Sequence, residues 1–252
     1  MRIFLISAAG GVGKAVCKAF AQANIKRIII VGRTLETLTQ VKLDLEAVFP
    51  TEVDVHAASV ADAAAIQRIV RGSGQIDIVV SAAAICHLVK PTSTIDPAEL
   101  SEILQTNTVG PFTLISTVLH ERAIQGWEND LKVIYISSAL SHIHISHLSG
   151  YAASKAAMNV LNTHLHVQWN ERGVSFFSLH PGLIYTTLTG KVFPADSPIW
   201  EDGKADPETS SILLLTRISG SLCGYLRVAM PPRSSIFERE GFVGDLGCSA
   251  VT

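Results

Sequence analysis

Residues 2–13 read RIFLISAAGGVG. The apolar run that ends at Ser7 predicts a buried β-strand, and the small residues after it predict a turn into a helix that begins near Val12. Small side chains let the backbone approach a pyrophosphate, whose charge the N–H groups and the helix N-terminus stabilise. The residues that carry this interpretation are Ser7, Gly11, Val12 and Gly13. A tight turn that binds nothing is the alternative interpretation.

Five further apolar runs of strand length follow, at residues 27–31, 52–58, 76–80, 132–137 and 174–179. Their polarity is continuous rather than alternating, which indicates burial on both faces, as in a parallel sheet. Helical patterns separate them, and one carries Asp96 as N-cap, Pro97 in its first turn and Glu99 for a capping box. The repeated units predict an α/β fold, a single Rossmann-type doubly wound domain with a central parallel sheet of about seven strands.

This domain is expected over residues 1–230, with a short seventh strand near 225–230. An irregular excursion at residues 188–204, rich in proline and glycine, follows the sixth strand. A helix is expected to open at Asp206-Pro207 and close at Gly220. Residues 231–252 predict an irregular C-terminal tail.

The composition excludes several classes of protein. Of 252 residues, 48% are hydrophobic and 17% charged, which predicts a large core, and the formal net charge of -2 gives no footprint for nucleic acid. No apolar run reaches the roughly 18 residues of a membrane span. The four cysteines are widely separated and form no CxxC pair, which favours reduced thiols in a cytoplasmic protein.

The second strand ends at Gly32-Arg33. An acidic residue at this corner would hydrogen-bond the adenosine ribose of NAD, whereas arginine suits the 2′-phosphate of NADP. Arg33 therefore favours NADP, unless it is simply a solvated residue at a helix start.

A proton-transfer pair follows the fifth strand. Tyr151 and Lys155 are four residues apart, so on a helix they share one face. A lysine ammonium near a phenol favours the phenolate, and a shift of about two pKa units needs roughly 2.7 kcal/mol, which one nearby cation supplies. The pair is therefore sufficient for general acid/base chemistry on a carbonyl or alcohol, with Ser138 placed to hold the substrate oxygen.

Together these residues resemble the short-chain dehydrogenase/reductase family, from the first strand to Thr186. The residues that match the family are Gly11-Val12-Gly13, Asn107, Ser138, Tyr151, Lys155, Pro181-Gly182 and Thr186. The resemblance implies a catalytic tetrad of Asn107, Ser138, Tyr151 and Lys155. Tyr151 would transfer the proton, Lys155 would lower its pKa and bind the nicotinamide ribose, and Asn107 would hold a relay water. The segment from Pro181 and Gly182 to Thr186 would flank the nicotinamide.

The dinucleotide half departs from the family pattern. Ile6-Ser7 stands where the family has Thr-Gly, Ser59-Val60 where it has Asp-Val, and Ser81-Ala82-Ala83-Ala84 where it has Asn-Asn-Ala-Gly. Each lost hydrogen bond weakens binding about fivefold, so cofactor binding is expected to be weakened rather than abolished. Ser59, Val60 and Ala83 remain expected cofactor contacts.

Three histidines, His142, His144 and His147, precede Tyr151 without a carboxylate or cysteine at ligand spacing, so no metal site is expected. The excursion contains Phe193, Ile199 and Trp200, which suggests either a cover for an apolar, polyketide-like substrate or a surface loop packed by its own aromatic residues. The resemblance also implies a homodimer or homotetramer, built from long helices expected over about residues 97–123 and 151–171.

Three hypotheses for function remain open. The first is an NADP-dependent oxidoreductase that interconverts a ketone and a secondary alcohol on a small-molecule substrate. The second is a non-redox isomerase, dehydratase or cyclase on the same scaffold, suggested by the departures in the cofactor half. The third is a ligand-sensing Rossmann protein without catalysis.

Overall fold

The computed structural model describes residues 1–87, 89–182, 184–193 and 226–227. One sheet of seven parallel strands has the order β3-β2-β1-β4-β5-β6-β7. The strands are β1 (Arg2–Ile6), β2 (Arg27–Gly32), β3 (Glu52–Ala57), β4 (Ile78–Ser81), β5 (Leu131–Ile136), β6 (Val174–His180) and β7 (Leu226–Arg227). The predicted doubly wound sheet of about seven strands is confirmed, and its seventh strand has two residues.

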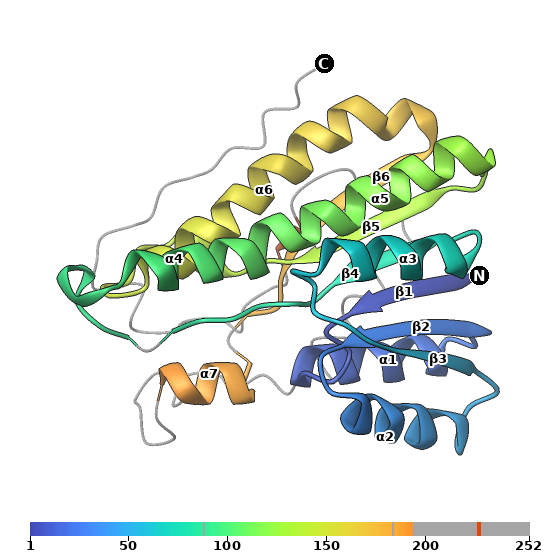
Figure 1. Ribbon diagram of the computed structural model, residues 1–252, viewed down its shortest axis with the longest axis horizontal. Helices are drawn as coiled ribbons and strands as arrows, with labels where there is room; N and C mark the ends of the chain where they lie inside the picture. Colours follow the sequence, from blue (N-terminus) through green and yellow to red (C-terminus); the bar gives the residue numbers. More distant parts are fainter. Residues whose placement is uncertain (88, 183, 194–225, 228–252) are drawn as a thin grey trace.

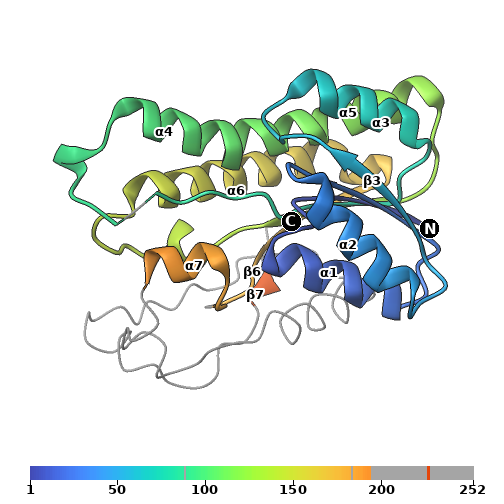
Figure 2. The ribbon, with the colours of Figure 1, turned by 60° about the horizontal axis from the view of Figure 1, so that its bottom comes forward.

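Helices cover both faces of this sheet (Figures 1 and 2). The helices on one face are α1 (Gly11–Gln22) and α2 (Leu35–Glu46); those on the other are α3 (Ala63–Ser73), α5 (Gly110–Gln125) and α6 (Ser149–Trp169). Alternate residues of β1 enter different cores, Leu5 on the α1 side and Phe4 on the α5 side, and both are 0% exposed. Burial on both faces explains why the strands are continuously apolar.

The order of the strands reverses beside β1. This strand pairs with β2 on one side and β4 on the other, so Ile6 lies opposite both Val31 and Ser81. In a doubly wound sheet the crevice outside the carboxyl ends of the strands at this switch point is the expected ligand site.

The predicted start of α4 (Pro97–Leu104) is correct in one part and wrong in another. Asp96 Oδ1 accepts a hydrogen bond of 2.8 Å from the N–H of Ala98, as an N-cap does. The carboxylate of Glu99, predicted to complete a capping box, instead accepts a hydrogen bond of 2.6 Å from Lys90 Nζ. An ion pair with the preceding loop takes the place of the hydrogen bond that Glu99 would make in a capping box.

The long helix expected over residues 97–123 is interrupted. A π-turn, η2 (Gln105–Val109), separates α4 from α5. π-turns are rare within helices and frequent at functional sites, because the extra residue redirects the side chains around it. The second long helix, expected over 151–171, is α6.

The excursion predicted at 188–204 begins as a regular helix, α7 (Thr187–Val192), so its irregularity is not observed at its start. Its remainder from Pro194, the helix expected at Asp206-Pro207 and the tail at 231–252 lie outside the described residues. Among the helices that the structure describes, none is both long and apolar enough to cross a bilayer.

Candidate active site

The turn between β1 and α1 has the shape that a dinucleotide pyrophosphate requires. Ser7 adopts a φ of 66°, the left-handed conformation that glycine normally supplies, and it does so where the family pattern has its first glycine. A Cβ on Gly13 would overlap the carbonyl oxygen of Ser7. The turn therefore needs Gly13 and tolerates Ser7 with strain.

The N-terminus of α1 is open to an anion. Its N-cap is Gly10, and within the described part of the chain no side chain caps the helix. Gly10 and Gly11 are exposed, so the helix N-terminus, which carries a positive partial charge, is accessible to an anion. These features fit a bound pyrophosphate.

The segment after β6 lies against this turn. A Cβ on Gly11 would lie 3.0 Å from Cγ2 of Thr186, so these two expected cofactor contacts are neighbours. Thr186 also forms a capping box with Thr189 at the start of α7, which fixes its side chain. Gly182 has a φ of 81°, which explains glycine after Pro181.

Four further expected cofactor contacts follow the ends of the neighbouring strands. Arg33 is exposed directly after β2, whereas Val60 and Ala83 are buried. Ser59 Oγ accepts a hydrogen bond of 3.2 Å from the N–H of Ala61, which leaves its own proton available to a ligand. The carbonyl of Val60 packs so closely on Gly110 that a Cβ there would lie 2.8 Å from it.

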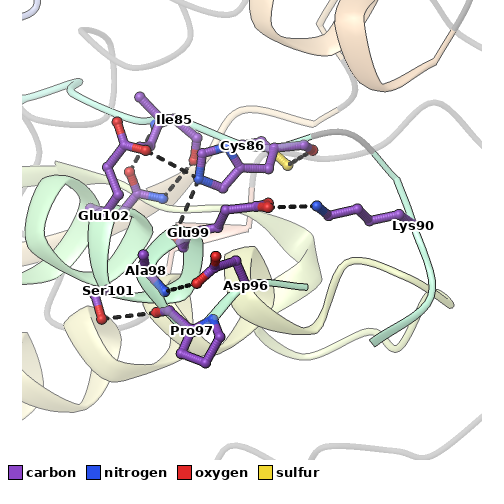
Figure 3. A network of polar contacts seen from close by, with 11 residues as sticks. Ile85, Cys86, Lys90, Asp96, Pro97, Ala98, Glu99, Ser101 and Glu102 are labelled. Atoms are coloured by element: carbon purple, nitrogen blue, oxygen red, sulfur yellow. Dashed lines mark hydrogen bonds and ion pairs between the residues drawn. The ribbon is translucent and has the colours of Figure 1, made fainter. Parts of the chain in front are cut away.

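Asn107 lies inside the π-turn and is 0% exposed. Its side-chain amide holds both backbone groups of Ile85, accepting from the N–H at 2.8 Å and donating to the carbonyl at 2.9 Å. It also donates a hydrogen bond of 3.0 Å to Ser154 Oγ on α6. Figure 3 shows Ile85 and Cys86 on the loop after β4, beside the start of α4. Asn107 thus fixes this loop to α6.

The three remaining residues of the expected tetrad meet at the carboxyl end of β5. Ser138 caps a short 3-10 turn, η3 (Ala139–Ser141), and its hydroxyl hydrogen-bonds to Tyr151. Lys155 is 1% exposed, and its Nζ lies 5.7 Å from the ring centroid of Tyr151. Lys155 Nζ also donates a hydrogen bond of 2.8 Å to the carbonyl of Ile136.

The protonation of this group differs from the expectation. Burial raises the pKa of Tyr151 above its ordinary value, the nearby thiol of Cys86 raises it further, and the hydrogen bond with Ser138 lowers it. Burial also lowers the pKa of Lys155 to about 7. The expectation that the pKa of Tyr151 is lowered is therefore wrong, because burial raises the pKa of the phenol and weakens the ammonium that would oppose this rise.

The sequence patterns do not predict two further side chains that lie at this site. Cys86 is close enough to influence the charge of both Tyr151 and Lys155, and burial raises its own pKa to about 11. Tyr135 on β5 also contacts Lys155, with its ring centroid 4.7 Å from Nζ. The position of Cys86 soon after a strand end was a usable indication, since carboxyl ends of parallel strands share one edge.

His142, His144 and His147 are exposed. Over the described ranges of the chain, no group of three or more His, Cys, Asp or Glu side chains is arranged to hold a metal ion.

A dinucleotide-type turn and a Ser-Tyr-Lys group at the carboxyl edge of one sheet define a Rossmann-type oxidoreductase. The model of the short chain dehydrogenase family matches residues 2–197. A short chain dehydrogenase/reductase of Aspergillus aculeatus, AacuD, is 32% identical over 201 residues, which are 79% of this chain and 69% of that protein. The chain belongs to the short-chain dehydrogenase/reductase family.

Solved structures share the fold. An alcohol dehydrogenase from Thermococcus sibiricus, complexed with 5-hydroxy-NADP, superposes with a TM-score of 0.75 at 21% identity, covering 87% of this chain and 91% of that one. An actinorhodin polyketide ketoreductase with NADPH superposes with a TM-score of 0.77 at 18% identity, covering 86% and 90%.

Proposed function

We propose that this member of the family is an NADP-dependent oxidoreductase that interconverts a ketone and a secondary alcohol. One observation carries the proposal: Ser138, Tyr151 and buried Lys155 meet at the end of β5, at the same sheet edge as the open N-terminus of α1. Proton-transfer groups beside a dinucleotide cradle are what carbonyl reduction requires.

In this reaction the chain holds the substrate and moves the proton. Ser138 donates a hydrogen bond to the substrate oxygen, and Tyr151 gives its hydroxyl proton to that oxygen during reduction or takes it back during oxidation. Lys155 stabilises the phenolate that remains and binds the nicotinamide ribose. Bound NADPH would supply the hydride to the carbonyl carbon.

Asn107 is proposed mainly as the residue that fixes the site. Its amide is already occupied by Ile85 and Ser154, so a relay water would instead bind at its main-chain carbonyl, which also accepts a hydrogen bond from Tyr135. In this proposal the main-chain carbonyl of Asn107, and not its side-chain amide, binds the relay water.

The dinucleotide would lie along the carboxyl edge of the sheet. Arg33 supports NADP over NAD, because its exposed guanidinium can bind the 2′-phosphate through two hydrogen bonds. The other proposed contacts are Ser7, Gly11, Val12, Gly13, Ser59, Val60, Ala83, Asn107, Tyr151, Lys155, Pro181, Gly182 and Thr186.

We further propose a small apolar substrate, a homodimer or homotetramer, a cytoplasmic location, and one domain over residues 1–230.

The non-redox alternative was suggested by departures from the family's cofactor pattern. The left-handed Ser7 weakens that reason, because the turn keeps its shape without the first glycine.

The test is a titration of the purified protein with NADPH, NADH or no nucleotide, followed by melting temperature. A ligand that binds only the folded state stabilises it by mass action, so NADPH should raise the melting temperature more than NADH at equal concentration. A ketone panel is then followed at 340 nm. Product without NADPH oxidation would favour the isomerase class, and no nucleotide effect together with no turnover would favour a sensing protein.

A further inference from the structure

Tyr135 on β5 contacts two residues of the proposed tetrad. Its side chain is 0% exposed. Its hydroxyl donates a hydrogen bond of 2.9 Å to the main-chain carbonyl of Asn107, and the centroid of its ring lies 4.7 Å from Lys155 Nζ. One side chain therefore joins the π-turn to the buried ammonium.

The hydroxyl of Tyr135 is a permanent donor. Burial raises its pKa well above the ordinary value, and the charge of nearby Tyr151 acts in the same direction, so the phenol stays protonated. Pro111, four residues after Asn107, has no N–H to give the Asn107 carbonyl its regular helical hydrogen bond, and a buried carbonyl without a donor is unfavourable. Tyr135 supplies a donor to the Asn107 carbonyl in the part of the helix that positions this residue.

The ring of Tyr135 faces the ammonium of Lys155, which is shielded from solvent. Lys155 is 1% exposed, and burial lowers its pKa to about 7. The Tyr135 ring is closer to Nζ than the Tyr151 ring, at 4.7 Å against 5.7 Å. An aromatic face attracts an ammonium most strongly where water is excluded.

Three titratable groups face Lys155 in the described structure: Tyr151 from its own helix, Tyr135 from β5, and Cys86 from the loop after β4. Burial raises the pKa of all three, that of Cys86 to about 11, so each is neutral near pH 7. The ammonium is therefore stabilised by the carbonyl of Ile136 and by aromatic faces rather than by a carboxylate.

We propose that Tyr135 is a positioning residue of the acid/base site: its hydroxyl fixes the main chain at Asn107, and its ring face keeps the ammonium of Lys155 charged. The kinetic part of this proposal rests on the proposed oxidoreductase function, whereas the titration of Lys155 does not.

The first experiment measures Lys155 directly. Protein labelled with ¹³C at the lysine ε-carbon is titrated by NMR, and the Lys155 resonance is identified by its loss in Lys155→Met. In Tyr135→Leu the pKa of Lys155 should fall by about half a unit or more, and in Tyr135→Phe it should stay near the wild-type value because the ring remains. Phe176→Leu is the matched control, since Phe176 is a buried aromatic residue in the same core. An unchanged titration of Lys155 in Tyr135→Leu would overturn the role of the ring.

A second pair of variants removes the dependence on Tyr135→Leu folding. Phenylalanine and its ring-fluorinated analogue at position 135 have nearly the same shape, but fluorination removes the negative face of the ring. The fluorinated protein should show the lower Lys155 pKa of the two. Equal values would contradict the proposal whatever the stability of either protein.

The kinetic experiment tests the hydroxyl. Tyr135→Phe should lower kcat about fivefold to tenfold with KM nearly unchanged. The midpoint of the loss of activity at alkaline pH should be the same as in the wild type. Tyr135→Leu should move that midpoint to lower pH. Wild-type kcat in Tyr135→Phe would overturn the role of the hydroxyl. If the wild type itself has no turnover, the proposed function fails while the NMR result still decides the role of the ring.

Discussion

Lys155 Nζ lies 5.7 Å from the ring centroid of Tyr151, one helical turn away on the same face of α6, and donates its hydrogen bond to the carbonyl of Ile136 on β5. The lysine is thus anchored to the sheet beside the phenol rather than ion-paired with it. Burial is the largest influence on both pKa values. A negatively charged dinucleotide bound nearby would favour the charged lysine, so the acid/base pair is expected to be completed by cofactor binding.

Replacing Tyr151 by Phe should lower kcat by about 10²–10⁴-fold, because the proton donor is lost while the ring stays in place. Cofactor affinity, measured by the NADPH-dependent rise in melting temperature, should change little. Wild-type turnover in Tyr151→Phe would exclude Tyr151 as the proton donor.

Replacing Ser7 by Gly should stabilise the protein by about 1 kcal/mol, because glycine adopts the φ of 66° without strain. In a protein of this size that corresponds to a rise in melting temperature of about 2–4 °C. Ser7→Ala is the control, since it keeps a Cβ in the left-handed conformation and should give no such gain. A lower melting temperature for Ser7→Gly would show that the serine hydroxyl contributes more than the strain removes.

Replacing Gly13 by Ala should destabilise the turn and abolish the effect of NADPH, because the new Cβ overlaps the carbonyl oxygen of Ser7. The control is Gly72→Ala in α3, where a Cβ meets no described atom within 4 Å. Alanine is the better helix former, so Gly72→Ala should be neutral or stabilising by up to about 1 kcal/mol. Thermal unfolding with and without NADPH measures both effects.

Replacing Arg33 by Ala should weaken NADPH binding about 10- to 100-fold, the loss expected when hydrogen bonds from a charged guanidinium to a phosphate are removed. NADH binding should be unchanged, since NADH has no 2′-phosphate. Arg68→Ala on α3, another exposed arginine, is the control for net charge. Equal losses for the two nucleotides would show that Arg33 does not read the 2′-phosphate.

Much of this fold follows from local sequence. The apolar runs identify strands to within about two residues because burial on both faces leaves little choice of residue type. The site residues Ser138, Tyr151 and Lys155 were identifiable because their spacing and chemistry are local to one strand end and one helix.

Other features depend on contacts between distant segments. The π-turn at Asn107 is stabilised by Ile85, Tyr135 and Ser154, which come from three other elements, so no periodicity predicts it. The predicted direction of the shift in the pKa of Tyr151 is wrong for the same reason. The penalty of burial depends on the packed structure rather than on the nearest cation.

The titration of Lys155 should also appear in the stability of the cofactor-free protein. The folded state lowers its pKa from 10.5 to about 7, so between these values the unfolded state binds more protons than the folded state. Stability therefore rises with pH through this window, by at most about 1.4 kcal/mol per pH unit from this group, and below pH 7 the full burial penalty remains. Lys155→Met removes the charge but keeps the length of the side chain, so its free energy of unfolding should rise less steeply between pH 7 and 10. Urea unfolding of both proteins at pH 7, 8 and 9 measures the difference. If the free energies of unfolding of the two proteins change with pH in parallel, folding does not lower the pKa of Lys155.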